Sequence, residues 1–405
     1  MSDDPIELLA QLVRIPSVNP MGRVVSDGAG HGVEGSIWRE GRLTAFLRER
    51  LSGGAFRIDV QEVEPERSNL LVTLPAATPP GEGGRWLVWD VHQDTVPIDG
   101  MVVPPFEGVR ENGRLYGRGA CDVKGSMAAM LVALERLREV PAGRRPTVTL
   151  VLSVNEEFGF TGARAAAAKL TRGEIYAARP DAAIVAEPTE FQVVVTHKGV
   201  VRWRIETRGK ACHSSSPDQG DNAIYRMARV LGGLDEYART VVGTLGHEPL
   251  LGSPTLSVGT IGGGVSVNTV PDFCTIDVDR RMAPEEDPAA AIAHVAQWLQ
   301  GKGLSDGVTH GEQLMSSRGL KAAGGERLAE SVLTATHDAG FSASTTIGVP
   351  YGTDAPAYSC LGIPAVVWGP GSIAQAHTKD EWIDEAAVHA YVDLLVEHAV
   401  RFAEA

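Results

Sequence analysis

The chain has 405 residues, 43% of them hydrophobic, which is more than one hydrophobic core usually holds, so two domains are expected. Its 37 basic and 51 acidic residues give a formal net charge of −14, which argues against nucleic acid and anionic lipid as partners. The acidic N-terminus has no apolar core typical of a secretory signal, and no stretch reaches the roughly 18 apolar residues of a membrane span. These features predict a soluble, cytoplasmic protein.

The cysteines lie far apart and lack the paired spacing of zinc knuckles or redox motifs. They are Cys121, Cys212, Cys274 and Cys360. We expect all of them to be free thiols.

Strand-like and helix-like segments alternate between residues 86 and 188. Apolar runs at 86–91, 147–154 and 181–186 have the character of buried strands, and 126–140 carries apolar residues at helical spacing. This alternation predicts an α/β fold with a mostly parallel sheet flanked by helices.

The pattern changes near residue 199 to alternating strands and amphipathic helices, and it returns to the first pattern near residue 316. We therefore expect a discontinuous catalytic domain formed by 1–198 and 316–405. The segment 199–315 is expected to be an inserted α+β domain. The glycine-rich stretch around residues 20–36 is predicted to be a loop or insertion.

Potential metal ligands follow the ends of the apolar strands or stand in glycine-rich turns. They are His92, Asp122, Glu157, Glu187 and His377. Imidazole and carboxylate groups suit borderline cations such as zinc, and a two-metal site needs about five of them, one bridging. Each alone would be an ordinary polar residue, but together they predict a two-metal hydrolase. Open α/β sheets place such sites at the carboxyl ends of their strands.

Asp94 lies two residues after His92, so on an extended strand both side chains point the same way. The Asp94 carboxylate is expected to bond to the far ring nitrogen of His92, which would fix its tautomer. The alternative is that Asp94 caps a helix or turn.

Glu156 and Glu157 are adjacent, so on an extended chain they would point to opposite sides. This predicts that the two glutamates have different roles. Glu157 would bind metal, and Glu156 would be the general base that moves a proton from water to the leaving nitrogen. Asp122, in a turn flanked by glycines, would bridge the two ions. The alternative for the paired glutamates is a solvated run of charge.

The motifs VHQDTVP, GRGACDVKG, NEEFG, AEPT and AHTKDEW occur in this order over nearly the whole chain. In combination they resemble the dinuclear zinc family of acetylornithine deacetylase, succinyl-diaminopimelate desuccinylase, aminoacylase and glutamate-type carboxypeptidases. The resemblance implies a zinc-exopeptidase-like catalytic domain. It also implies that His92, Asp122 and Glu187 hold one ion, that Asp122, Glu157 and His377 hold the other, and that the Asp122–Val123 peptide bond is cis.

The runs YGTDAPAY and GPGSIAQAHTKDEW are most similar to the acetylornithine deacetylase branch of arginine biosynthesis. Asp354 stands where that branch often has Glu, and Asn155 where Asp is frequent. The resemblance implies that the inserted domain is a dimerisation and lid domain, whose His213 stabilises the oxyanion in the partner subunit's site. It further implies substrate contacts from Asn268, Arg281, Gly352 and Thr353.

The sequence therefore predicts a homodimeric, metal-dependent deacylase. It would cleave the linear amide of an N-acyl amino acid, N-acetylornithine in the first place, with a metal-activated water and two divalent ions. Zinc is expected, with cobalt or manganese as alternatives. Other possibilities are a carboxypeptidase, a dipeptidase or a desuccinylase with the same metal centre. A rival of another class is a binding protein that lost catalysis, but no ligand or base is missing.

Overall fold

A computed structural model describes residues 4–25, 36–53 and 56–404. The chain forms two compact units. The first comprises the residues up to Val195, Ala322–Ile347 and the residues from Thr353 onward, and the second comprises Thr196–Lys321 and Gly348–Gly352. The second unit starts before residue 199 and continues past residue 315. The strand β14 (Val308–Ser317) pairs with β9 (Gly199–Arg208) up to Ser317, and an isolated bridge then joins Leu320 to His197. Most of the glycine-rich stretch, residues 26–35, lies outside the described residues.

The first unit contains an eight-stranded sheet in the order β1-β2-β6-β3-β7-β16-β8-β15. The neighbours β6, β3, β7 and β16 pair in parallel, whereas β1, β2 and β8 join in antiparallel fashion. The strand bounds are β1 Arg57–Glu64, β2 Arg67–Leu74, β3 Trp86–His92, β6 Thr147–Ser153, β7 Ala182–Val185, β8 Val193–His197, β15 Thr346–Val349 and β16 Ala365–Val367. The last residues of β8 and β15 fall in the second unit. This mostly parallel sheet with helices around it confirms the predicted fold class.

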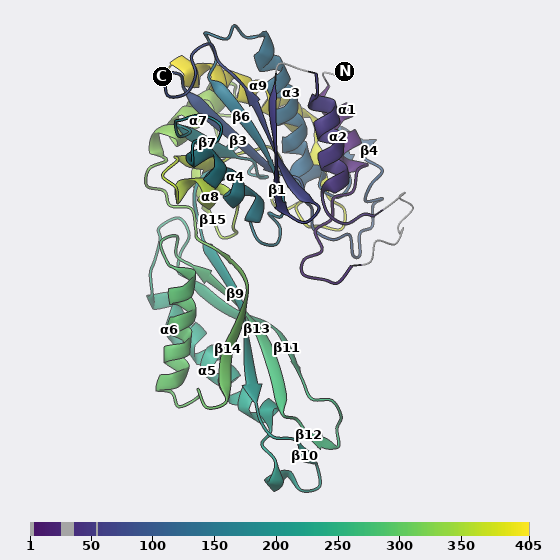
Figure 1. The fold of residues 1–405 in the computed structure, drawn as a ribbon, viewed down its shortest axis with the longest axis vertical. Coiled ribbons are helices and arrows are strands. Elements are labelled where there is room, and N and C mark those ends of the chain that lie inside the picture. The colour runs from purple at the N-terminus through teal and green to yellow at the C-terminus, as the bar shows by residue number, and fades with distance from the viewer. Residues whose placement is uncertain (1–3, 26–35, 54–55, 405) are drawn as a thin grey trace. The chain divides into compact units, whose positions relative to one another are not determined.

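Helices cover the central strands because these strands are apolar on both faces. Every residue of β3, β6 and β7 is buried, as parallel sheets require. Helices α1, α3, α7 and α9 pack together and α4 packs against α8 (Figure 1). Their bounds are α1 Pro5–Val13, α2 Gly41–Leu51, α3 Gly125–Glu139, α4 Thr161–Thr171, α7 Glu326–Asp338, α8 Ala355–Ser359 and α9 Glu385–Glu404.

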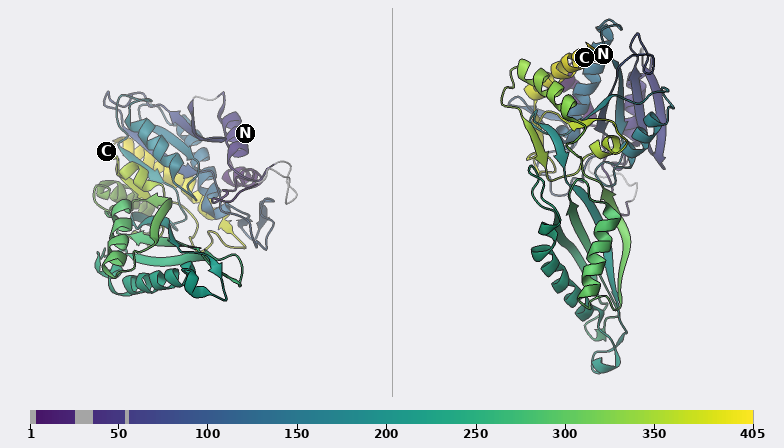
Figure 2. Two further views of the ribbon diagram at one scale, coloured as in Figure 1. Left: turned by 60° about the horizontal axis from the view of Figure 1, so that its bottom comes forward. Right: turned by 90° about the vertical axis from the view of Figure 1, so that its left-hand side faces the viewer.

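The second unit is a four-stranded antiparallel sheet, ordered β11-β13-β9-β14, with two helices on one face (Figure 2). In β9 and β13 buried and less buried residues alternate, which is the pattern of a sheet packed on one side. The remaining bounds are β10 Cys212–His213, β11 Thr255–Gly263, β12 Thr269–Val270, β13 Phe273–Met282, α5 Ala223–Thr240 and α6 Pro288–Gly301.

A small three-stranded sheet joins distant parts of the first unit. It consists of β4 (Val109–Glu111), β5 (Arg114–Tyr116) and β17 (Trp382–Asp384), with β5 in the middle. The pairing of β5 with β17 brings the start of the Asp122 turn beside the segment that follows His377.

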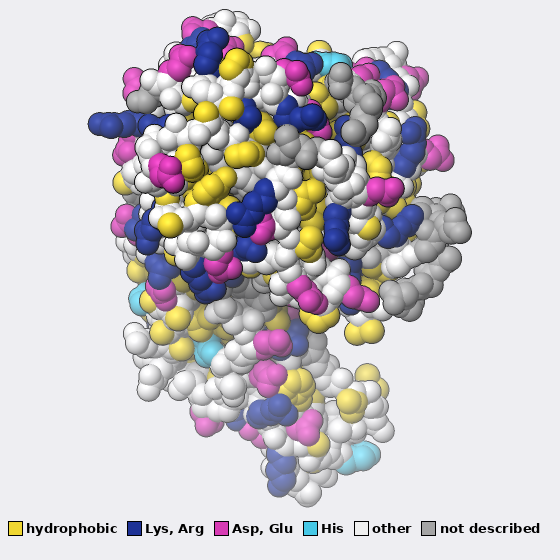
Figure 3. Space-filling model, turned by 45° about the horizontal axis from the view of Figure 1, so that its top comes forward, with side chains coloured by type: hydrophobic (Ala, Val, Ile, Leu, Met, Phe, Trp, Pro, Cys, Tyr) yellow, Lys and Arg dark blue, Asp and Glu magenta, His cyan; other side chains and the backbone are white. Residues whose placement is uncertain are grey.

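Acidic and basic side chains are interspersed over the face of the molecule shown in Figure 3. All four cysteines are free, as predicted. Among the described residues, no helix is long and apolar enough to cross a membrane.

Candidate metal centre

Four adjacent strands deliver most of the predicted ligands to one edge of the large sheet. His92 ends β3, the Glu156–Glu157 pair follows β6, Glu187 follows β7, and His377 lies in the loop after β16. Because β6, β3, β7 and β16 are parallel neighbours, these loops lie at the carboxyl edge of the sheet. This is where open α/β sheets build their sites.

Asp122 comes from the turn before α3, where the Asp122–Val123 peptide bond is cis, as predicted. Its Oδ1 lies 3.1 Å from Nε2 of His92 and its Oδ2 lies 3.2 Å from Nε2 of His377. The carboxylate therefore stands between two imidazoles, each facing a different oxygen. A carboxylate placed in this way can offer one oxygen to each of two cations.

The possible ligand atoms form two overlapping groups. His92, Glu156 and Glu187 offer atoms within 4.8 Å of one another, and so do His92, Asp122 and Glu157. The Nε2 atom of His377 is 3.2 Å from Glu157 Oε2. The first group contains Glu156, which was expected to act as a base and not as a ligand.

The donor set fits divalent cations. Nitrogen and carboxylate oxygen are the ligands that zinc and similar metals prefer, at about 2.0–2.2 Å from the ion. The Oε1 atom of Glu157 is buried and has no hydrogen-bond partner among the described residues. Such an acceptor is normally satisfied, and a bound cation would satisfy this one.

The electrostatics of the cluster favour positive charge. Burial, and then the charge of Glu187, raises the pKa of Glu156 well above its usual range. Burial and Asp122 act in the same way on the pKa of Glu187. Burial opposes the protonation of His377, but its bonds to Asp122 and Glu157 dominate and raise its pKa to about 11. Four buried carboxylates thus lie beside the buried imidazole of His92 and the half-exposed imidazole of His377. Divalent cations would relieve the repulsion between the carboxylates.

Asp94 is placed differently from the prediction. The Nδ1 atom of His92 lies 2.9 Å from the backbone oxygen of Asp94, whereas the Asp94 carboxylate is 3.7 Å away. The main chain therefore orients the imidazole of His92, so that its Nε2 atom faces Asp122. The carboxylate of Asp94 instead accepts the backbone N–H groups of Glu156 and Glu157, each at 3.1 Å, and the amide of Asn19 at 2.7 Å. These three donors draw the carboxylate away from the imidazole.

Glu156 and Glu157 do not lie on an extended chain as expected. They stand in a turn that begins at Asn155, whose φ is 62°. A buried ion pair supports this left-handed residue, because Glu40 accepts the Asn155 N–H at 3.1 Å and Arg67 donates to the Asn155 Oδ1 at 2.8 Å. The turn separates the two carboxylates, one toward Glu187 and the other toward His377.

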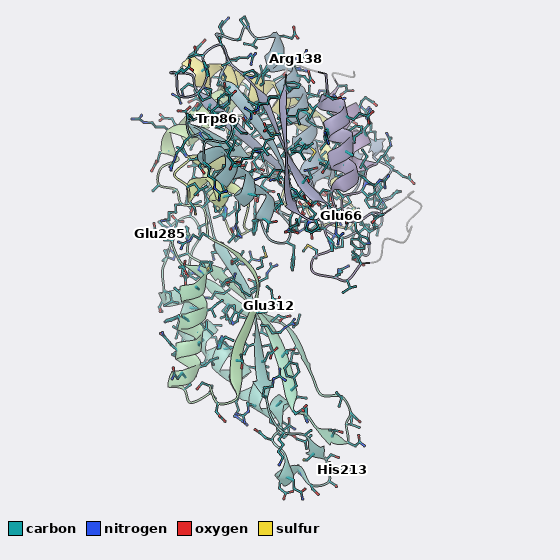
Figure 4. The ribbon with its side chains drawn as sticks, viewed as in Figure 1. Glu66, Trp86, Arg138, His213, Glu285 and Glu312 are labelled. Atoms are coloured by element: carbon teal, nitrogen blue, oxygen red, sulfur yellow. The ribbon has the colours of Figure 1, made fainter. Side chains whose placement is uncertain are left out.

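The remaining predicted residues belong to other parts of the chain. His213 lies on β10 of the second unit (Figure 4), and the backbone oxygen of Asn268 accepts the N–H of Ser214 at 3.1 Å. Arg281 pairs with Asp279 at 2.8 Å on β13. Gly352 ends the second unit, and Thr353 is a buried residue at the start of the next segment of the first unit. Their roles toward substrate stay predictions.

Sequence reasoning missed several buried charged residues around the centre, and four of them form two ion pairs. These four are Glu40, Arg67, Arg118 and Glu381. Glu40 and Arg67 stand outside any motif, so no local signal pointed to them. Glu381 closes the AHTKDE run, and its position four residues after His377 was a signal that was not used.

A family model described as peptidase family M20/M25/M40 matches residues 88–401. The chain belongs to this family. It is 32% identical over 348 residues to an acetylornithine deacetylase of Myxococcus xanthus, covering 84% of this chain and 87% of the relative. It is 30% identical over 368 residues to an acetylornithine deacetylase of Shigella sonnei (strain Ss046), with 88% and 89% covered.

The fold is also similar to that of the M20 metallo-carboxypeptidase Sso-CP2 of Sulfolobus solfataricus. The TM-score is 0.76 at 17% identity, and all of both chains is covered. Membership of the M20 family makes the protein a metal-dependent hydrolase that acts on amide bonds. The candidate metal centre is the part of the chain whose chemistry suits that activity.

Proposed function

We propose that the protein is a deacylase of N-acyl amino acids similar to acetylornithine deacetylase, with N-acetylornithine as its first candidate substrate. Two observations support the proposal together. All the predicted ligands and Glu156 converge on one cluster, which is buried except for the half-exposed side chain of His377. The chain also shares 30–32% of its residues, over most of its length, with proteins of that activity.

We propose that the ligands divide into two sets that share Asp122. His92 and Glu187 would hold one divalent ion with Asp122, and Glu157 and His377 would hold the other with the second oxygen of Asp122. When bound, such ions lower the pKa of water and polarise the amide carbonyl. We propose zinc, with cobalt or manganese as alternatives, because this mixed imidazole and carboxylate set is not selective among them.

Glu156 is the proposed general base. Its carboxylate lies close to Glu187 and His92, and its main chain is fixed by Asp94. In hydrolysis, Glu156 takes a proton from water as the water oxygen bonds to the carbonyl carbon of the amide. It then returns that proton to the nitrogen as the carbon–nitrogen bond breaks, which yields a carboxylic acid and a free amine. One residue thereby serves as base and then as acid.

The second unit is the proposed dimerisation domain. β11 is an edge strand, and edge strands expose unpaired backbone groups that invite pairing. Ile224 and Tyr225 of α5 and Val265 beyond β11 line one cavity of about 900 Å³ and are exposed. An exposed apolar surface beside a free strand edge fits a second copy of this chain. His213 would then serve the partner's site, where a donor to the oxyanion is worth about 3–4 kcal/mol.

The substrate class is tested by comparing kcat/KM for N-acetylornithine, N-succinyl-diaminopimelate and a dipeptide at saturating zinc. We expect the N-acetyl substrate to be preferred by at least about tenfold. The Glu156→Gln variant is the control that assigns the activity to this site. A preference for the dipeptide or the succinyl substrate would contradict the proposed substrate and leave the hydrolase in place.

A further inference from the structure

Two segments far apart in the sequence meet beneath the Asp122–His377 pair. One is the turn from Gly117 to Asp122, and the other runs from His377 to Glu381. The backbone N–H of Gly117 donates to the backbone oxygen of Glu381 at 3.0 Å. The pairing of β5 with β17 flanks this contact.

The side chain of Glu381 connects the two segments more tightly. One of its oxygens accepts the backbone N–H groups of Cys121 and Asp122, each at 3.0 Å. The other accepts the N–H of Gly119 at 3.0 Å and Nη1 of Arg118 at 2.6 Å. The carboxylate is fully buried, and these four donors all belong to the turn that contains Asp122.

Arg118 extends the connection back toward the histidine. Its side chain is almost fully buried, and its Nη2 donates to the backbone oxygen of Thr378 at 3.3 Å. Thr378 directly follows His377. The chain of contacts thus runs from the main chain beside His377, through Arg118 and Glu381, to the backbone N–H of Asp122.

We propose that Glu381 is a positioning residue of the metal centre, which sets the distance between Asp122 and His377. The inference rests on the proposed metal-holding role of these two residues. Glu381 itself accepts from backbone N–H groups and from Arg118, and it has no part in the proposed proton transfers. Its function is to hold the Asp122 and His377 loops in one fixed arrangement, in which Asp122 Oδ2 and His377 Nε2 stand 3.2 Å apart.

The substitution Glu381→Gln tests this role with little change in volume. An amide keeps one acceptor oxygen but turns an NH₂ group toward Arg118 and Gly119, which are both donors. Groups that orient metal ligands typically contribute 10–100-fold to metal affinity. We therefore expect the second equivalent of Co²⁺ to bind 10–100-fold more weakly, while the first equivalent, which can keep His92 and Glu187 as ligands, is weakened less.

Glu385→Gln is the matched control. Glu385 lies four residues further along and also pairs with an arginine, Arg110, at 2.7 and 2.9 Å, but on the surface and without contact to the Asp122 turn. The Glu385→Gln protein should bind both equivalents of Co²⁺ as the unchanged protein does. Binding is measured by calorimetric titration of the metal-free proteins, and the visible absorption of bound Co²⁺ reports the geometry of its ligands.

Circular dichroism in excess chelator first establishes that each variant is folded. If Glu381→Gln is not folded, Glu381→Asp takes its place, since it keeps the charge one methylene shorter and should weaken the second equivalent to a smaller degree. Normal binding of both equivalents and an unchanged Co²⁺ spectrum in the folded variant would overturn the proposal, as would equal weakening by Glu385→Gln.

The unchanged protein separates this inference from the proposed function. If it hydrolyses no N-acyl amino acid but Glu381→Gln still loses the second equivalent, the proposed substrate is wrong and the positioning role stands. If the unchanged protein deacylates normally, and Glu381→Gln binds both equivalents of Co²⁺ and deacylates equally well, the positioning role is wrong and the proposed function stands.

Discussion

A buried histidine in α9 makes the stability of the first unit depend on pH. His398 is fully buried, and neither ring nitrogen has a hydrogen-bond partner among the described residues. Its ring lies beside Trp368 and Phe402, with centroids 6.5 and 6.0 Å away. Burial, and then the charge of Arg401, lowers the pKa of His398 to about 4. We predict that replacing it with leucine stabilises the protein in mild acid.

The sign follows from the protons bound in each state. Between pH 6.5 and 4 the unfolded chain binds a proton at this histidine and the folded one does not, so folding loses stability as the pH falls. The change from an ordinary pKa of about 6.5 is worth about 3.4 kcal/mol in full. At pH 5 about 2 kcal/mol of this is already expressed, and at pH 7 almost none.

Urea unfolding of the metal-free proteins in chelator, at pH 7 and pH 5, measures the effect. The stability of His398→Leu relative to the unchanged protein should rise by about 2 kcal/mol between the two pH values. His389→Leu removes an exposed imidazole from the same helix and serves as the control. If the difference between His398→Leu and the unchanged protein is the same at both pH values, the reasoning from burial is refuted.

Three further predictions concern the site and its support. Glu156→Gln should keep its metals by elemental analysis and lose 10²–10⁴-fold in kcat, and near-normal turnover would count against a base role. Mixing this variant with His213→Ala under subunit exchange should restore about one quarter of the activity, and no recovery despite exchange would exclude a shared site. Glu40→Gln removes the buried carboxylate that Arg67 pairs with and leaves the arginine with the longer ion pair to Glu64 at 3.5 Å. It should cost about 3–5 kcal/mol in urea unfolding, against less than about 1 kcal/mol for the exposed Glu66→Gln. An equal loss of unfolding free energy in the two variants would refute the claim that the buried pair of Glu40 and Arg67 stabilises the protein.

The positions of the candidate ligands were predictable because local sequence and strand topology act together there. His92, Glu157 and Glu187 follow apolar strands, and parallel neighbours bring such positions to one edge. The central strands 86–91 and 147–154 were predicted within a residue or two of β3 and β6. Asp122 was predicted as the bridge from its glycine-flanked turn between the sheet segments that carry the other ligands, whereas its cis peptide bond to Val123 was expected only from the family resemblance.

The supporting contacts could not be predicted from local patterns. The pair of Glu40 with Arg67 and the bonds of Glu381 join residues that meet only in the folded chain. The role of Asp94 was assigned wrongly because period-two geometry was assumed past the end of the strand. The positive φ of Asn155 directs the backbone N–H groups of Glu156 and Glu157 to the carboxylate of Asp94. The β1–β2 hairpin was not predicted, because β1 has no fully buried residue to give it an apolar signature.

The central claim is that metal ions at the buried cluster are required for amide hydrolysis. The most direct test is to strip the protein with chelator and to follow N-acetylornithine hydrolysis while Zn²⁺ is added back. We expect the metal-free protein to be inactive and activity to rise until about two equivalents are bound. Full activity of a protein that elemental analysis shows to be free of metal would contradict the account.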